Sequence, residues 1–295
     1  MGAPSARHGP AADDRCRQER LKIEALLKET PMNPKPFTSG LSEHAVKITR
    51  VADRQWHALD DDLVVGRGYA AHRPDGRLFV SIDAWHDTAF DRLAEAMLPE
   101  LPAPLYTVVD EADVELTDRW RRAGFTIRRR EWEYAVPTDP RVTGLAEVPP
   151  PPGVTIVPAG QADEGLLREV DRAIRDEIEA TTGWWQSMPA EVLPRPEDDT
   201  IVDPSKYAVA AAPDRYLGLI RVVTVIRPRI GLIAVRAAEQ RRGIARALLA
   251  HALERLHHSG FTEAWTEVHE SNQAASALIE SIGARSVSSN LELVR

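Results

Sequence analysis

The residues with the clearest chemistry in this chain form a short turn that combines one glycine with several arginines. The turn follows an apolar run at residues 230–235 and precedes an amphipathic segment that Gly260 ends. A strand that enters a helix through such a turn leaves backbone N–H groups without intrahelical partners, at the positive end of the helix dipole. Because Gly243 has no Cβ to hinder an anion, we expect a phosphate site here. Its residues are Gln240, Arg241, Arg242, Gly243, Ile244, Ala245 and Arg246.

The segments around this phosphate turn, residues 240–246, alternate between helix and strand. Apolar residues recur at helical spacing from Ile244 to Leu256, and residues 261–268 have the composition of a strand. A second helix is expected to begin near Asn272 and to end at Gly283, before a last strand. The phosphate turn is therefore expected to belong to an α/β domain.

In this order, the phosphate turn and the segment Asn272–Ala284 resemble the GNAT family of acyl-CoA-dependent N-acyltransferases. The resemblance implies that the phosphate turn binds the pyrophosphate of coenzyme A. It also implies that the pantetheine arm lies along the main chain of Ala234, Val235 and Arg236 and beside the helix that carries Asn272 and Ser276. A Rossmann dinucleotide site is disfavoured, because the turn has one glycine and lacks the others at dinucleotide spacing.

Four consecutive prolines at 149–152 divide the chain, which at 295 residues is long enough for two domains. Thr107–Asp113 aligns with Thr266–Asn272 when it is shifted by 159 residues. We therefore predict an internal duplication and an α/β fold class of two tandem GNAT-like units, each a mixed, mostly antiparallel sheet flanked by helices. The predicted parts are an N-terminal arm with a short helix at 1–40, a degenerate GNAT-like unit at 41–140, a proline-rich linker at 141–153 and a catalytic GNAT unit at 154–295.

The first unit lacks a phosphate turn of its own. No glycine lies between Ala84 and Leu93, and Asp83, Asp87 and Asp91 would repel a pyrophosphate. We expect that this unit does not bind coenzyme A and instead supports the acceptor site of the second unit or forms a wall of it.

Acyl transfer to an amine requires a route for the proton of the ammonium. Alternation along 264–270 puts Glu267 and His269 on one face of the expected strand, and both are candidates for the general base. Glu179, in an expected helix at 163–180, is a third candidate. An exposed edge strand, a strand end in solvent and a solvated helix face are the alternative explanations of these three residues.

Three further residues are candidates for binding the acceptor. Glu177 lies in the helical stretch that shapes the acceptor pocket in GNAT proteins, and two tryptophans follow this stretch. A solvated helix face and ordinary core packing are the alternatives. The candidates are Glu177, Trp184 and Trp185.

One position departs from the family pattern. Many GNAT members have a tyrosine in the Asn272 helix that protonates the leaving thiolate, and here that position is Ile279. Either the thiolate leaves unassisted, which its acidity relative to an amine allows, or Ser276, another hydroxyl or water donates the proton.

The composition limits the partners. A net charge of −8 argues against nucleic acid and mildly favours a cationic acceptor, and no run is long enough to cross a membrane. A single cysteine, Cys16, is consistent with a cytoplasmic protein, and no His, Asp or Glu set has metal-ligand spacing.

The resemblance and the residues together predict an acetyl-CoA-dependent N-acetyltransferase, without a metal, that acts on a primary amine of a small molecule or peptide. An acetyltransferase similar to mycothiol synthase is one alternative. A non-catalytic acyl-CoA-binding or scaffold protein is another, because of Ile279 and the eroded first unit.

Overall fold

The computed structural model describes residues 46–73, 76–146, 148–181, 183, 188, 202–224 and 227–295. The expected N-terminal arm and both candidate tryptophans, Trp184 and Trp185, lie outside the described residues.

The first half of the chain folds as an antiparallel meander followed by alternating helices and strands. Helix α2 begins after His86, whose ring caps it, and turns an apolar face to the sheet. The elements are β1 (Lys47–Ala52), β2 (Gln55–Asp60), β3 (Leu63–His72), β4 (Leu78–Ala84), α2 (Asp87–Met97), η1 (Leu98–Glu100), β5 (Leu105–Asp110), α3 (Val114–Arg122) and β6 (Thr126–Pro137).

Strands β1 and β2 form a hairpin. Ala52 pairs with Gln55, so that Asp53 and Arg54 make the turn between β1 and β2. Arg54 adopts a φ of 60°, a left-handed conformation that is uncommon for arginine and that the sequence therefore does not predict.

The second half repeats this plan after a short connecting helix, α4 (Pro140–Thr143). The apolar stripe expected from Ile244 to Leu256 is buried along α7. The elements are β7 (Thr155–Val157), α5 (Glu164–Glu179), η3 (Pro204–Lys206), β8 (Tyr207–Ala211), β9 (Tyr216–Thr224), β10 (Pro228–Val235), η4 (Ala237–Glu239), α7 (Ile244–His258), β11 (Glu263–His269), α8 (Gln273–Glu280) and β12 (Arg285–Val294).

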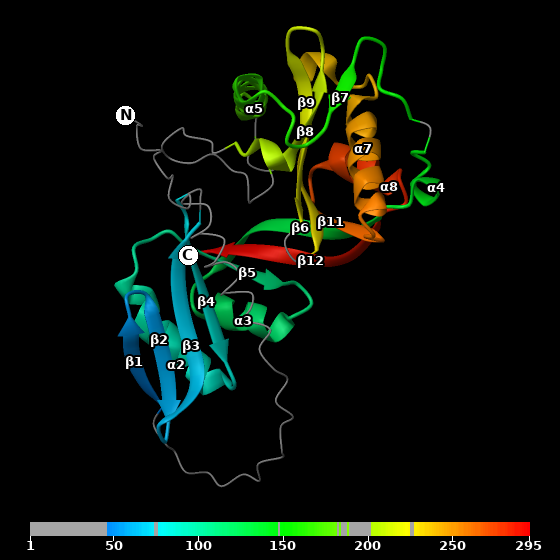
Figure 1. Ribbon diagram of the computed structural model, residues 1–295. Helices are drawn as coiled ribbons and strands as arrows, with labels where there is room; N and C mark the ends of the chain where they lie inside the picture. The colour runs from blue at the N-terminus through cyan, green and yellow to red at the C-terminus, as the bar shows by residue number, and fades with distance from the viewer. Residues whose placement is uncertain are drawn as a thin grey trace, which may run out of the picture. The chain divides into compact units, whose positions relative to one another are not determined.

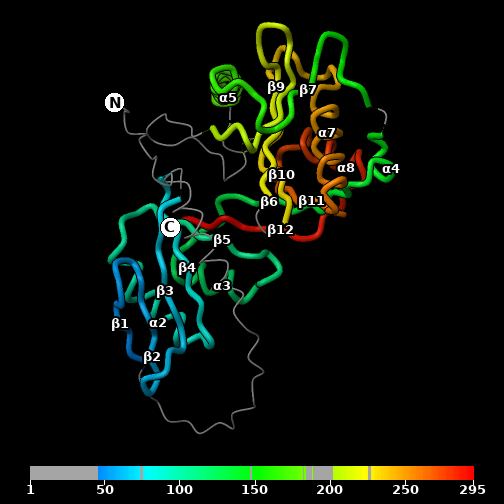
Figure 2. Tube along the Cα trace, viewed as in Figure 1, coloured from blue at the N-terminus to red at the C-terminus, as the bar shows by residue number. Residues whose placement is uncertain are grey.

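The two halves share one twelve-stranded sheet, because each gives its last strand to the other. The strand order is β1-β2-β3-β4-β5-β12-β6-β11-β10-β9-β8-β7. β12 thus lies beside β5 of the first half, and β6 lies beside β11 of the second (Figures 1 and 2). The strand next to the expected catalytic strand β11 therefore comes from the other half of the chain.

The pairing has the symmetry that the 159-residue repeat predicts. The shift places Val114 on Gln273, the first residues of α3 and α8. Glu131 pairs with Asn290, its own counterpart under the shift, at the centre of the β6–β12 ladder. The pairs and bulges on either side of this centre match under the same shift, as expected of an internal duplication.

Helices cover both faces of the sheet in the second half. Ala208 and Ala210 of β8 belong to the core under α7 and α8, whereas Tyr207 and Val209 belong to the core under α5. Figure 1 shows α5 and α7 on opposite sides of β8 and β9. The gap between β10 and β11 therefore opens to two faces of the sheet, one covered by α5 and the other by α7.

Candidate functional site

Strands β10 and β11 part soon after they meet. They pair in parallel over two residues, Arg229 with Trp265 and Ile230 with Thr266. The hydroxyl of Thr266 donates to the carbonyl of Ile230 at 3.0 Å and closes this short ladder. A bulge follows in β10, after which β10 pairs with β9 alone among the described strands. The rest of β10 therefore presents main-chain groups toward the gap.

The residues expected beside pantetheine lie at the end of β10. Ala234 and Val235 are partly buried in the stretch that has left β11. The N–H of Arg236 donates to the carbonyl of Leu217 at 2.9 Å, and the amide of Gln240 reaches back to the carbonyl of Val235 at 3.1 Å. These bonds fix the path from the strand into the phosphate turn.

The phosphate turn leads into the N-terminus of α7, which has no side-chain cap. Arg241 and Gly243 adopt φ angles of 64° and 89°, and Gly243 is the N-cap of α7 with no side-chain cap. Within the described chain, none of the backbone N–H groups of Arg241–Arg246 donates to a backbone or side-chain acceptor. Six N–H groups at the positive end of the helix dipole are thus available to an anion.

The arginines of the turn differ in their partners. Arg242 pairs with the carboxylate of Glu239. The side chains of Arg241 and Arg246 make no ion pair with any residue that the structure describes. Arg241 and Arg246 are thus the two whose charge is available to a phosphate.

The corresponding helix N-terminus in the first half, at the start of α2, is capped by the protein itself. The N-cap of α2 is His86, whose Nδ1 accepts the N–H of Ala89 at 3.2 Å. Asp87 follows in the first turn and pairs with Arg119 at 2.5 Å. A side chain and a carboxylate thus take the place that an anion would need.

Glu177, a candidate for acceptor binding, contacts the segment that leads from β10 into the phosphate turn. One carboxylate oxygen accepts from Nε of Arg236 at 2.6 Å and the other from the N–H of Ala237 at 2.7 Å. Glu179, two residues on, is exposed at the end of α5 and has no partner within the described chain.

Asn272 is the N-cap of α8, and its side chain accepts the N–H of Ala275 at 3.2 Å. Ile279, at the position of the family tyrosine, is 2% exposed in the core shared with α7. No hydroxyl stands at residue 279 to protonate a leaving thiolate.

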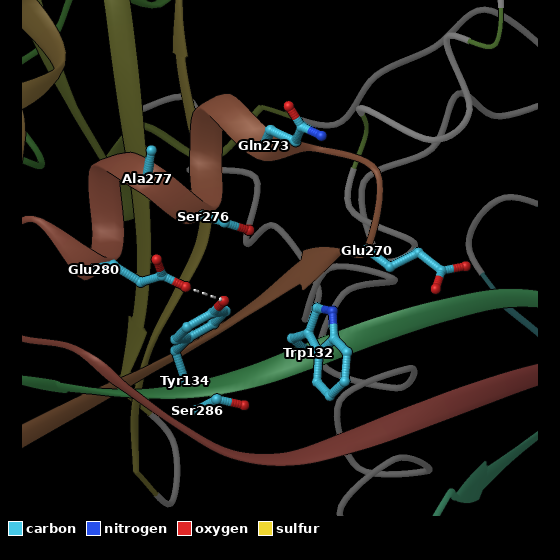
Figure 3. A pocket seen from close by; sticks show the side chains of 8 residues that line it. All are labelled: Trp132, Tyr134, Glu270, Gln273, Ser276, Ala277, Glu280 and Ser286. Atoms are coloured by element: carbon cyan, nitrogen blue, oxygen red, sulfur yellow. Dashed lines mark hydrogen bonds between the residues drawn. The ribbon is translucent and has the colours of Figure 1, made fainter.

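Ser276 faces a hollow of about 480 Å³ between α8 and the exchanged strands (Figure 3). Burial raises the pKa of Tyr134, so its hydroxyl stays protonated and donates to Glu280 at 2.9 Å. This hollow is not apparent in the sequence. Its lining residues are Trp132, Tyr134, Glu270, Gln273, Ser276, Ala277, Glu280 and Ser286.

His269 is buried at the end of β11, where it is 5% exposed. Burial and the nearby Arg129 guanidinium lower the pKa of His269 to about 4. Its Nδ1 accepts the N–H of Ser271 at 3.0 Å, so the neutral ring carries its proton on Nε2. His269 is therefore a weak base toward an ammonium.

Glu267 lies across the ladder from Glu133 of β6. Each carboxylate has an arginine from the β10 region: Arg229 pairs with Glu267, and Arg227 pairs with Glu133 at 2.5 Å. Like charges directly opposite each other repel, and these two arginines offset the repulsion. A basic role for Glu267 requires that Arg229 release it.

Glu133 and Tyr134 are the site-facing residues that the sequence does not reveal. Both belong to β6, which the sequence assigns to the first unit. The internal repeat is the sequence feature that relates β6 to the second unit, because β6 and its counterpart β12 are the last strands of the two halves.

Among the described residues, no three His, Cys, Asp or Glu side chains lie close enough to hold a metal ion. No helix in the described ranges has the length and apolar character needed to span a bilayer.

Known sequences resemble part of this chain. The family model described as "Acetyltransferase (GNAT) family" matches residues 172–284. Curated relatives named "[Ribosomal protein bS18]-alanine N-acetyltransferase", from Escherichia coli K12 and Salmonella typhimurium, are each 49% identical over 51 residues. Each match spans 17% of this chain and 34% of the relative, about a third of its length.

Known structures resemble a larger share of this chain than the known sequences do. A tandem GNAT protein from the clavulanic acid biosynthesis pathway aligns with a TM-score of 0.60 at 15% identity, over 96% of this chain and 95% of its own. A GCN5-related N-acetyltransferase from Sphaerobacter thermophilus aligns with a TM-score of 0.56 at 17% identity, over 84% and 82%. These likenesses show the fold, two GNAT-like units in tandem.

Proposed function

We propose that this protein, in which residues 172–284 match the model of the GNAT family of acetyltransferases, transfers the acetyl group of acetyl-CoA to a primary amine. The acceptor is a small molecule or a peptide, and its amine attacks the thioester directly in a ternary complex. The proposal rests most on one observation, the six backbone N–H groups at the start of α7 that have no partner within the described chain.

The coenzyme would enter along the gap between β10 and β11. Its diphosphate would meet the N–H groups of the phosphate turn together with Arg241 and Arg246. The pantetheine arm would lie along the edge of β10 that has parted from β11, near Ala234 and Val235 and beside the N-terminus of α8 at Asn272. Bound acetyl-CoA supplies an activated acyl group on a thiol leaving group.

The acceptor side is the face that carries α5. Glu267, Glu133 and His269 lie on this face of β11 and β6, beside Arg229 and other arginines. The relatives named for the alanine N-terminus of a ribosomal protein support a peptide amine as one acceptor class. Because His269 is a weak base, we propose that the ammonium proton leaves to water or to Glu267.

Release of the thiol tests this function. Full-length protein is mixed with acetyl-CoA and a panel of amines, which includes peptides with N-terminal alanine, a cysteinyl amine of the mycothiol-precursor class and polyamines. Free thiol is measured with DTNB, and the acceptor is examined by mass spectrometry for one added acetyl group. The proposal predicts release of thiol that depends on one class of amine.

A non-catalytic acyl-CoA-binding protein is the second candidate, favoured by Ile279 and by the low basicity of His269. It predicts acetyl-CoA binding by calorimetry without thiol release for any amine in the panel. If acetyl-CoA does not bind at all, both candidates are excluded.

A further inference from the structure

We propose that Glu177 is a positioning residue that ties helix α5, on the acceptor face, to Arg236 and Ala237, which lead into the phosphate turn. This inference rests on the proposed function and adds to it a coupling between the two halves of the site. It gives Glu177 a role different from binding the acceptor.

The geometry of Glu177 uses its whole carboxylate. Oε1 accepts from the Arg236 guanidinium and Oε2 from the backbone N–H of Ala237, at 2.6 and 2.7 Å. Charge-assisted hydrogen bonds of this length are among the stronger ones in proteins. The side chain of Glu177 is 28% exposed and that of Arg236 is 36% exposed, so solvent weakens the contact only in part.

Helix α5 offers a fixed support for this contact. Leu167, Val170 and Ile174 are buried against the sheet, at 3% exposure or less. On the same helix, Arg175 pairs with Asp171 at 2.8 Å, with side chains 11% and 3% exposed. The carboxylate is therefore held by a helix that is itself anchored.

Glu177 contacts the residues that set the path of the chain into the phosphate turn. Arg236 and Ala237 link the end of β10 to η4, and the two residues with positive φ, Arg241 and Gly243, follow within the same loop. A displacement at Ala237 would move the N–H groups that meet the diphosphate. Binding at α5 and binding of the coenzyme are thereby linked, and such coupling is reciprocal.

The test is Glu177→Gln in the full chain, with Glu169→Gln as the matched control. Glu169 is an exposed glutamate on the same helix and has no partner within the described chain. A glutamine can accept from only one of the two donors, so we expect the Kd and KM for acetyl-CoA to rise about tenfold. We expect kcat and the acceptor KM to change less than about twofold, and Glu169→Gln to match the wild type.

Hydrogen exchange provides a readout that needs no coenzyme. The amide of Ala237 should exchange faster in Glu177→Gln than in the wild type, with the exchange of the α7 core unchanged. A raised acceptor KM with unchanged coenzyme affinity would overturn the proposal, as would unchanged exchange at Ala237. If the wild type fails to bind acetyl-CoA, the proposed function fails, while the exchange result still decides whether Glu177 holds the turn.

Discussion

His269 is a buried imidazole that the fold keeps neutral, and this has a consequence for stability. Its pKa of about 4 lies below the ordinary value of 6.5, chiefly because burial disfavours the charged ring. Above pH 6.5 neither the folded nor the unfolded chain carries this proton. As the pH falls toward 4, the unfolded chain takes up the proton first, so stability that is fully present above pH 6.5 is lost.

We predict that the wild type loses about 3 kcal/mol more unfolding free energy between pH 7 and pH 4 than His269→Gln does. Urea unfolding at the two pH values measures the difference. His257→Gln, at an exposed position on α7, serves as the control and should keep the wild-type dependence. Equal losses in the wild type and His269→Gln would contradict the assignment of His269 as a neutral buried group.

The arginines of the phosphate turn should not be equivalent. Arg242 is already paired with Glu239, whereas Arg241 and Arg246 have no such partner within the described chain. We predict that Arg241→Gln and Arg246→Gln each raise the Kd for acetyl-CoA about fivefold or more, and Arg242→Gln by less than about twofold. Calorimetry in low salt measures the three values. A larger effect of Arg242→Gln would reverse the assignment.

At the scale of elements, the exchanged strands carry matched ion pairs between the halves. Glu133 of β6 pairs with Arg227, and Glu292 of β12, its counterpart in the repeat, pairs with Arg77 and Arg128. The two sites differ in burial, because the carboxylate side chain is 15% exposed at Glu133 and 4% exposed at Glu292. We therefore expect the Glu292 ion pairs to contribute more to stability than the Glu133 ion pair.

We predict that Glu292→Gln destabilises the protein by about 3 kcal/mol, because two poorly solvated guanidinium groups lose their carboxylate. Glu133→Gln should cost about 1 kcal/mol or less, because Arg227 is 49% exposed and water can solvate it. Denaturant unfolding of the two variants checks the order. A Glu133 variant less stable than the Glu292 variant would show that burial does not set the difference.

Much of the second half could be predicted from the sequence, because its signals are local. The phosphate turn, the stripe of α7 and the cap at Asn272 each depend on residues within a few positions of one another. The strand exchange could not be predicted, because the partner of β6 is set by contacts more than a hundred residues away. The partners of Glu177 and Glu267 were hidden for the same reason.

At the scale of the whole molecule, the exchange makes the two halves depend on each other. Without β6, the second half would expose long unpaired edges on β11 and β12, and without β12 the first half would expose β5 and β6. The first half thus supplies a strand of the second half's sheet, although the start of its own helix α2 is closed to an anion.

We predict that residues 154–295 alone are insoluble or lack a cooperative unfolding transition. Coexpression with residues 44–153 should restore a soluble complex, because both exchanged strands are then present. Size-exclusion chromatography and thermal unfolding measure this. A stable, cooperatively folded 154–295 fragment would contradict the role given to β6.

The central claim is that the turn at Gly243 binds the diphosphate of an acyl-CoA, and calorimetry with a matched pair of variants tests it most directly. Gly243 and Gly260 lie at opposite ends of α7, with φ angles of 89° and 86° and with no atom closer than 3.9 Å to an added Cβ. The backbone strain of an aspartate is thus similar at both. Wild type and Gly260→Asp should bind acetyl-CoA with similar Kd, whereas Gly243→Asp, whose carboxylate faces the phosphate site, should bind about a hundredfold more weakly or not at all. Wild-type affinity in Gly243→Asp, or no binding by the wild type, would contradict the account.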